Sequence, residues 1–338
     1  MAESVQLEAE DVRIIRALQI DPRASFAAIG SALGLTEAAV GRRYRRLRAH
    51  GVVRVAGIVD PGALGQSKWL VRLRCRPGSV AAIADALAKR EDVSWVALSA
   101  AGSEITGAVR SRTPEQRDDL LGRRLPRIAA VIDVQAFAML RQFVGGRGHY
   151  WAALTGVLTP AEEAALGSDD SGPFVEAPVV AKDPALLTAA DGKLLGLLAV
   201  DGRASLVDLA AAADLTPGRV SRRLEALVAR RVVHVDVEIA AGALGYRALA
   251  VLWLRVHPSA VKTVGRTLAR EPEIMFAAAV SGPYNLHAVA HCRDLDELFE
   301  FTTDRIGSLT GVQTMEVVPI HQQLKQAGTL VSAGRLVS

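Results

Sequence analysis

Arginines are concentrated in two short stretches of the sequence, and their type and spacing suit contact with phosphate groups. One cluster lies between Arg42 and Arg48, and the other begins at Arg219. Guanidinium groups bind phosphates and guanine edges, and a helix that carries them fits the major groove of DNA. The alternative is that each cluster is only a solvated basic face. The clusters contain Arg42, Arg43, Arg45, Arg46 and Arg48, and Arg219, Arg222, Arg223, Arg230 and Arg231.

Residues that suit metal binding or catalysis are sparse. His287 and His291 share one face of a predicted strand, but four residues of strand span about 13 Å, too far to chelate one ion. Two cysteines, Cys75 and Cys292, are too few for a zinc site or a disulfide framework. The sequence contains no glycine-rich phosphate loop after a strand and no nucleophile elbow. We therefore expect no metal, no cofactor and no enzymatic activity.

The composition is that of a globular chain. The 338 residues are 50% hydrophobic and 22% charged, and this length allows two domains or more. The longest apolar run, Ala248–Leu254, is far shorter than the roughly 18 residues that a membrane span needs, and Met1–Ser4 begins no signal sequence. We therefore expect a cytoplasmic protein. Residues 1–141 carry 22 Lys and Arg against 15 Asp and Glu, so the first part of the chain is the more positive.

The sequence repeats itself at a separation of 180 residues. Asp21-Pro22-Arg23 falls on Asp201-Gly202-Arg203, and nine of nineteen positions are identical between Leu35–Val53 and Leu215–Val233. This agreement indicates a duplicated module of about 140 residues.

The front part of each copy has the apolar spacing of three helices. Thr36 and Thr216 are predicted N-caps of the third helix, Pro217 suits a first helical position, and Thr188-x-x-Asp191 resembles a capping box. The predicted helices are Leu7–Leu18, Ser25–Leu33 and one that follows Thr36, and Leu187–Leu198, Leu206–Ala213 and one that follows Thr216.

The back part of each copy predicts the order strand-helix-strand-strand-helix-strand, which is the βαββαβ pattern of a ferredoxin-like domain. Ala248–Leu254 is apolar on both faces, so the open face of its sheet needs a partner, either the sheet of the other copy or that of another chain. A locally hydrophobic strand is the alternative. The predicted elements are Val71–Arg76, Ser79–Lys89, Val93–Ser99, Ile105–Arg110, a helix from Thr113 and Val131–Leu140, and Leu249–Val256, Ser259–Arg270, Ile274–Val280, Leu286–His291, Asp294–Ile306 and Val312–Val318.

An ordered set of residues, present in both copies, resembles the Lrp/AsnC (feast/famine) family of bacterial transcription regulators. The set comprises Asp11 and Asp191 in the opening helix, the Asp-Gly-Arg turn at Asp201, Gly34-Leu35-Thr36, the pairs Arg42-Arg43 and Arg222-Arg223, and Leu64-Gly65 and Leu244-Gly245. The duplication resembles the tandem form among actinobacterial regulators. The resemblance implies an α+β chain with two copies of a winged or helix-turn-helix domain that binds double-stranded DNA, each followed by a ferredoxin-like RAM domain for assembly and for a small effector, often an amino acid.

The resemblance also implies sites. Arg42, Arg43, Arg222 and Arg223 match the family pattern best, whereas Arg45 and Arg46 become Glu225 and Ala226, so the two copies should read different half-sites. The expected DNA-binding residues are Thr36, Arg42, Arg43, Arg45, Arg46, Thr216, Arg219, Ser221, Arg222 and Arg223.

The expected effector site is the turn between the second and third strands of each ferredoxin-like domain, where the family carries Gly-x-x-Asp. Here the turns read Gly102-Ser103-Glu104 and Gly282-Pro283-Tyr284-Asn285, and Asn285 replaces the acid that would bind an ammonium group. The expected effector-binding residues are therefore Gly102, Ser103, Glu104, Gly282, Tyr284 and Asn285. The alternative is a tight hairpin in which glycine supplies a positive φ.

Two other functions stay open. Siroheme decarboxylases share this two-part architecture, and Leu244-Gly245-Tyr246-Arg247 resembles part of theirs, but Val233–Glu238 stands where their basic-Gly-Ala and Asn-His-Arg segment is expected. A DNA-binding architectural protein without an effector is the second.

We expect helix-turn-helix domains at 1–60 and 184–240, ferredoxin-like domains at 66–142 and 246–325, a linker at 143–183, and assembly of the chain into a homo-oligomer.

Overall fold

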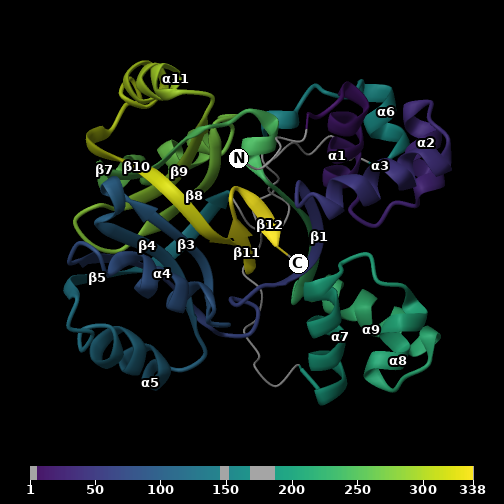
Figure 1. Ribbon diagram of the computed structural model, residues 1–338, viewed down its shortest axis with the longest axis horizontal. Helices are drawn as coiled ribbons and strands as arrows, with labels where there is room; N and C mark the ends of the chain where they lie inside the picture. The colour runs from purple at the N-terminus through teal and green to yellow at the C-terminus, as the bar shows by residue number, and fades with distance from the viewer. Residues whose placement is uncertain (1–5, 145–151, 168–186, 338) are drawn as a thin grey trace.

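The computed structural model describes residues 6–144, 152–167 and 187–337. Two three-helix units lie on one side of the molecule and a β-barrel lies on the other (Figure 1). The two copies of the repeat therefore both contribute a helical unit. The units consist of α1 (Ala9–Ile20), α2 (Phe26–Leu33) and α3 (Glu37–Ala49), and of α7 (Ala189–Val200), α8 (Leu206–Ala213) and α9 (Pro217–Ala229).

Side-chain caps define where these helices begin. Thr36 Oγ1 accepts a hydrogen bond from Ala39 N at 3.2 Å, and Thr188 and Asp191 form the predicted capping box of α7. Thr216 is the N-cap of α9, as predicted, but its side chain makes no cap hydrogen bond. Pro217 occupies the first position of α9, where a missing N–H costs nothing. Within the described residues, no helix is long and apolar enough to cross a bilayer.

A two-stranded ribbon connects the helical units. Strand β1 (Val53–Val59) pairs antiparallel with β6 (Val233–Ile239), and Ala56 faces Asp236 at the centre of the register. Neither strand was predicted from the sequence, because each one pairs with the other copy and has no partner nearby in sequence. Gly202 lies so close to Ala56 N that a Cβ would come within 2.9 Å of it, which explains a glycine at this turn.

The Asp-x-Arg turns tie the two helical units together through reciprocal hydrogen bonds. Arg23 donates to the carbonyl oxygens of Gly202 and Ala204, and Arg203 donates to those of Pro22 and Ala24. Arg203 also lies 4.7 Å from the ring centroid of Phe26, a cation–π distance. The repeated turn thus serves the contact between the copies.

The barrel is built by both copies. Its hydrogen-bonded order is β10-β3-β4-β2-β5-β8-β9-β7, and β7 pairs with β10 to close the ring of eight strands. The first copy supplies β2 (Ser67–Cys75), α4 (Val80–Ala88), β3 (Val93–Ser99), β4 (Glu104–Ser111), α5 (Pro114–Arg117) and β5 (Val131–Val144). The second supplies β7 (Ala248–Val256), α10 (Val261–Leu268), β8 (Ile274–Val280), β9 (Leu286–Cys292), α11 (Leu295–Glu300) and β10 (Val312–Gln326), followed by β11 (Thr329–Ser332) and β12 (Arg335–Val337).

Two long strands close the barrel because each one changes partner along its length. β5 pairs with β2 up to Ala138 and with β8 of the other copy from Met139 onward. β10 pairs with β7 up to Pro319 and with β3 from Ile320 onward. The predicted strands were too short at these places, since the last residues of β5 pair with β8 and those of β10 pair with β3, in each case a strand of the other copy. Closure leaves no open edge within the ring.

The strand Ala248–Val256 is buried on both faces, as its sequence predicted. Leu252 and Leu254 pack with the helices outside the barrel, whereas Val251 and Trp253 belong to an interior cluster. Trp253 is fully buried and its ring centroid lies 4.8 Å from that of Phe137, which comes from the first copy. The partner of the open sheet face is therefore the sheet of the other copy.

Part of the predicted linker packs on the first helical unit. Leu154, Leu158 and Leu166 join its apolar core, and the buried Arg16 forms an ion pair with Glu163 at 2.6 Å. This segment includes α6 (Pro160–Ala165). The linker-like stretch 168–173 lies outside the described residues.

Replacing Trp253 with alanine should destabilise the barrel by about 3–5 kcal/mol, because it leaves a cavity in the cluster that both copies share. Urea unfolding followed by circular dichroism measures this. Leu140→Ala is the matched control, since Leu140 lies on β5 but is 68% exposed. Equal effects of the two variants would contradict the assignment of Trp253 to the interior.

Candidate nucleic-acid interface and effector sites

The third helix of each unit exposes a row of polar residues. On α3 and at its start, Thr36, Arg42 and Arg45 are exposed, although the Thr36 hydroxyl also caps the helix. On α9 and at its start, the exposed residues are Thr216, Arg219 and Arg222. Both helices belong to the two helical units that lie away from the barrel in Figure 1. These side chains are therefore accessible to solvent.

Two of the predicted DNA-binding arginines on α3 bind a buried carboxylate. Arg43 Nη1 lies 3.1 Å from Asp11 Oδ1, and Arg46 Nη2 lies 2.5 Å from Asp11 Oδ2. The Asp11 side chain is fully buried, and Arg43 also pairs with Glu8 at 2.8 Å. Hydrogen bonds to Glu8 raise the pKa of Arg43. These arginines therefore fasten the third helix to the first.

The second copy repeats this ion pair with the same separation of 32 residues. Arg223 donates from Nε and Nη2 to the two carboxylate oxygens of Asp191, each at 2.5 Å, in a bidentate pair. Burial alone raises the pKa of Asp191, but the hydrogen bonds from Arg223 and Thr188 outweigh burial and lower it to about 2. The recurring Asp and Arg were the signal for this pair, although the arginine pattern had been interpreted as contact with DNA.

Two further residues on α9 have local partners. Ser221 Oγ donates to Glu225 Oε1 at 2.9 Å, and Arg222 Nε donates to the Gly218 carbonyl oxygen at 3.3 Å. The bond from Arg222 leaves its terminal amino groups to the exposed face. Ser221 is the less accessible of the two.

The turn of the second copy at Gly282–Asn285 is held by the backbone at the end of β7. The Asn285 side chain accepts from Val256 N at 2.8 Å and donates to the Val256 carbonyl oxygen at 2.7 Å. Gly282 has a φ of 106°, a conformation that favours glycine. Asn285 therefore connects the turn to the end of β7, and its role in effector binding stays a prediction.

The two predicted effector turns meet through an ion-pair network. Arg72 lies between Glu104 (2.9 Å) and Glu316 (2.5 Å), and Tyr284 hydrogen-bonds to Glu316. Glu104 is 3% exposed, and burial raises its pKa despite Arg72. Gly102 has a φ of 81° in the turn, and the Ser103 hydroxyl donates to the Ala100 carbonyl oxygen. The two turns are thus connected through Arg72 and Glu316, which lie on β2 and β10.

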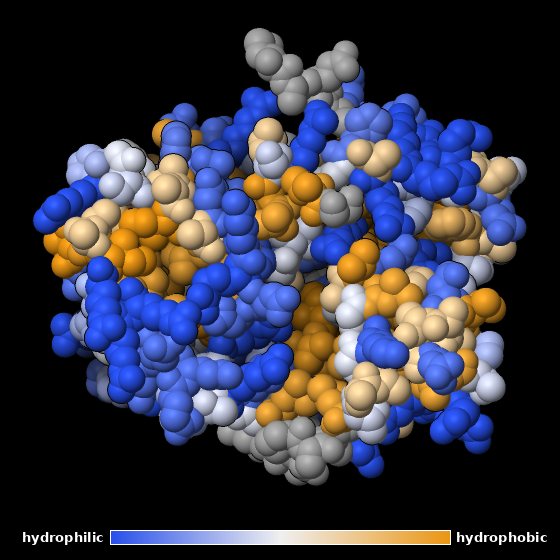
Figure 2. All heavy atoms as spheres, turned by 60° about the horizontal axis from the view of Figure 1, so that its bottom comes forward, coloured by the Kyte–Doolittle hydropathy of each residue, from blue (hydrophilic) through white to orange (hydrophobic). Residues whose placement is uncertain are grey.

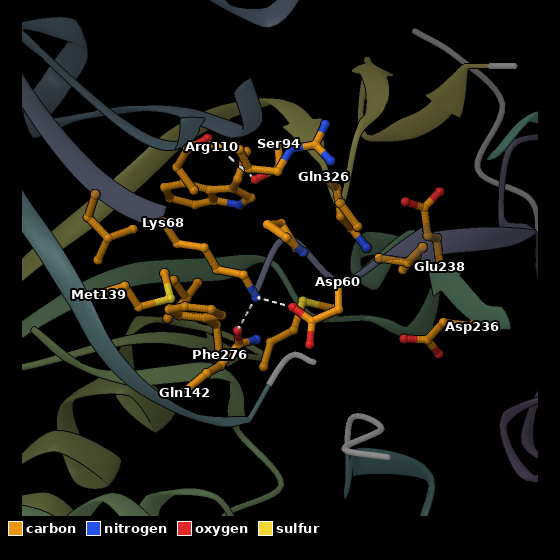
Figure 3. A pocket seen from close by; sticks show the side chains of 18 of the residues that line it. Asp60, Lys68, Ser94, Arg110, Met139, Gln142, Asp236, Glu238, Phe276 and Gln326 are labelled. Carbon is orange, nitrogen blue, oxygen red and sulfur yellow. Dashed lines mark hydrogen bonds and ion pairs between the residues drawn. The ribbon is translucent and has the colours of Figure 1, made fainter. Parts of the chain in front are cut away.

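A cavity of about 380 Å³ lies where the barrel faces the β1–β6 ribbon. Lys68, near the start of β2, lines it, whereas Arg72 lies further along the same strand toward the turns. Lys68 extends toward Asp60 and Gln142, while Asp236 and Glu238 lie on the ribbon side (Figure 3). The cavity was not predicted from the sequence, because its walls come from both copies.

Two buried histidines line the same cavity. Each of His287 and His291 is 1% exposed, and burial lowers the pKa to about 3 for His287 and about 4 for His291. Both are therefore neutral at physiological pH. Within the described residues, no group of three or more potential ligands gathers into a metal site.

Replacing Asp191 with asparagine should destabilise the second helical unit by about 2 kcal/mol. This is less than the loss of a fully buried ion pair would cost, because the Arg223 side chain is 31% exposed. The pKa of Asp191 falls on folding, so the pair stabilises the wild type above about pH 4 and this contribution is lost as the pH falls toward 2. Urea unfolding at pH 7 and pH 2.5 measures both effects. Glu225→Gln on the exposed face of α9 is the control; an Asp191→Asn variant with wild-type stability would refute the role of the pair.

Family models match both copies of the chain. The AsnC-type helix-turn-helix domain matches residues 9–48 and 187–228, and the Lrp/AsnC ligand binding domain matches residues 249–330. The chain is similar in fold to the siroheme decarboxylase NirDL, with a TM-score of 0.62, 15% identity, and coverage of 94% of this chain and 93% of that one.

Archaeal regulators are similar in sequence. The HTH-type transcriptional regulator FL11 of Pyrococcus abyssi (strain GE5 / Orsay) is 31% identical over 119 residues, which are 35% of this chain and 79% of that protein. The FL11 regulator of Pyrococcus furiosus is 26% identical over 142 residues, or 41% of this chain and 93% of that protein. With its two helix-turn-helix units and its ligand-binding domain, the chain belongs to the Lrp/AsnC family of transcriptional regulators.

Proposed function

We propose that this protein binds specific DNA sequences through α3 and α9 and regulates transcription in response to a small effector. The observation that carries this proposal is the presence of two helix-turn-helix units joined by one ribbon, each with exposed arginines on its third helix. A recognition helix with such side chains fits the major groove. The protein would bind DNA and regulate transcription in the cytoplasm of a bacterium, where the DNA lies.

The proposal includes the division of the chain into tandem units. Helix-turn-helix domains at 1–60 and 184–240 alternate with ferredoxin-like domains at 66–142 and 246–325, as in the tandem-duplicated actinobacterial type, with residues 143–183 between the copies. In each copy the first strand of the barrel lies between the third and the fourth, which supports the ferredoxin-like assignment. Further association of chains into homo-oligomers is part of the proposal.

The two recognition helices should read different half-sites. Arg42 and Arg222 occupy equivalent positions, but Arg45 corresponds to Glu225, and a carboxylate repels phosphate. Asp11 binds two arginines, Arg43 and Arg46, whereas among the described residues Asp191 binds one arginine, Arg223. We propose Arg42, Arg45, Arg219 and Arg222 as the side chains that contact DNA, with Thr36, Thr216 and Ser221 beside them.

A second candidate is a siroheme decarboxylase. The fold likeness to NirDL spans nearly the whole chain, and buried histidines line the cavity. Three carboxylates also line it, namely those of Asp60, Asp236 and Glu238, and they disfavour a tetrapyrrole that itself carries many carboxylates. An unchanged visible spectrum of iron uroporphyrin on addition of protein would exclude this candidate, and a shifted one would support it.

Replacing Arg42 and Arg222 together with alanine should weaken DNA binding and lower the slope of log affinity against log salt by about 0.9 for each phosphate that is no longer neutralised. The double variant Arg43→Ala with Arg223→Ala is the matched control. Its main effect should be a lower thermal stability, because those side chains form ion pairs with Asp11 and Asp191. Fluorescence anisotropy with duplexes selected by the purified protein measures affinity. An unchanged slope in the first double variant would refute the proposed contacts.

A further inference from the structure

The cavity lies between the barrel and the β1–β6 ribbon. Its lining comes from barrel strands of both copies, such as β4 and β9, and from both strands of the ribbon. On the face shown in Figure 2, apolar surface lies in the hollow between the barrel and the second helical unit. A volume of about 380 Å³ suits a small organic ligand.

The barrel side of the cavity is apolar and partly aromatic. Trp95 and Phe276, one from each copy, line the cavity and pack against the interior cluster of the barrel without being fully buried. Leu70 and Met139 extend this surface. Such a surface favours an aromatic ring, which gains from both apolar burial and ring contacts.

The ribbon side of the cavity is acidic. Glu238 is 4% exposed, and its Oε2 accepts from Thr329 and lies 3.6 Å from Arg54 Nη1 in an ion pair. Within the described residues its Oε1 has no hydrogen-bond partner. Asp236 lies close to it in sequence and accepts a hydrogen bond from the backbone of Val237 at 2.7 Å. Burial raises the pKa of Glu238 to about 7 and that of Asp236 to about 6, so a cation nearby would favour the charged forms.

The cations on the barrel side are already engaged. Lys68 Nζ lies 3.5 Å from Asp60 Oδ1 and donates to Gln142 at 3.2 Å, and Arg110 donates to the Glu91 carbonyl oxygen at 2.6 Å. A ligand with a carboxylate would have to compete with these partners. A ligand with an ammonium group would instead meet Glu238 Oε1, which has no hydrogen-bond partner among the described residues.

His287 marks the barrel end of the cavity. Among the described residues neither of its ring nitrogens has a hydrogen-bond partner, and its ring lies edge-on to Trp253 at 4.5 Å. A neutral imidazole offers one donor and one acceptor. A polar group on an aromatic ring, such as a phenol hydroxyl or an indole N–H, would form a hydrogen bond with the His287 imidazole.

We propose that this cavity binds an aromatic primary amine, with its ring against Trp95 and Phe276, its ring substituent at His287 and its ammonium group at Glu238 and Asp236. The ligand bridges the barrel and the β1–β6 ribbon, which connects the two helix-turn-helix units. Binding would therefore favour one placement of the ribbon over others. This last step, and only this step, rests on the proposed function in DNA binding.

Isothermal titration of the whole chain tests the site with tyramine, tryptamine and phenethylamine, and with 3-(4-hydroxyphenyl)propionate and indole-3-propionate as anions of matched shape. We expect the amines to bind and the propionates to bind at least about tenfold more weakly. Phenethylamine, which lacks the ring substituent, should bind more weakly than tyramine. Propionates that bind as tightly as the amines, or amines that do not bind, would overturn the proposal.

Two variants locate the site. Glu238→Gln keeps the shape and the Thr329 contact but removes the charge, and Ala108→Phe fills the cavity from β4; both should lower amine affinity at least about tenfold. Glu316→Gln, in the Arg72 network outside the cavity, should leave it unchanged. Thermal unfolding of each variant reports folding, and wild-type affinity in both Glu238→Gln and Ala108→Phe would overturn the site.

DNA affinity measured with and without saturating tyramine separates the two proposals. A change in affinity supports the coupling through the ribbon. Amine binding with unchanged DNA affinity overturns the coupling but not the site, and a protein that binds amine but no DNA overturns the proposed function alone.

Discussion

The structure depends on the burial of the inner faces of two sheets that neither copy can cover with its own helices. Trp253 and Val251 on one copy, and Leu70 and Phe137 on the other, form a single interior cluster. An apolar sheet face left in water would cost free energy in proportion to its area, so the two sheets must meet. β5 and β10 fix how they meet, because each strand is shared between the copies.

A second constraint holds each recognition helix in place. Successive residues on a helix point about 100° apart, so when Arg43 turns inward to Asp11 its neighbour Arg42 faces solvent. The same division separates Arg222 from Arg223. One arginine of each pair thus orients the helix, and the other is presented outward. Two adjacent arginines in a sequence do not by themselves show which one orients the helix and which one faces solvent.

The sequence predicted well whatever depends on local pattern or on the repeat. The first two helices of each helical unit, the capping box at Thr188 and strands such as Val93–Ser99 lie close to where apolar spacing and cap residues placed them. The ribbon and the second halves of β5 and β10 were missed because their partners lie in the other copy. The predicted effector turns were found as turns, but their polar groups bind Arg72 and Val256. The cavity could not be foreseen, since it exists only after both copies close around it.

Because the ring of eight strands is completed within one polypeptide, its assembly is a unimolecular event. Diluting the protein leaves the two halves at the same effective concentration, and neither half can exchange with another chain in the way that subunits of a homodimer can. Each half is then free to change its own sequence while the opposite half compensates. The replacement of Pro22 by Gly202, and of Arg45 by Glu225, at equivalent positions of the repeat is the kind of divergence that covalent linkage permits.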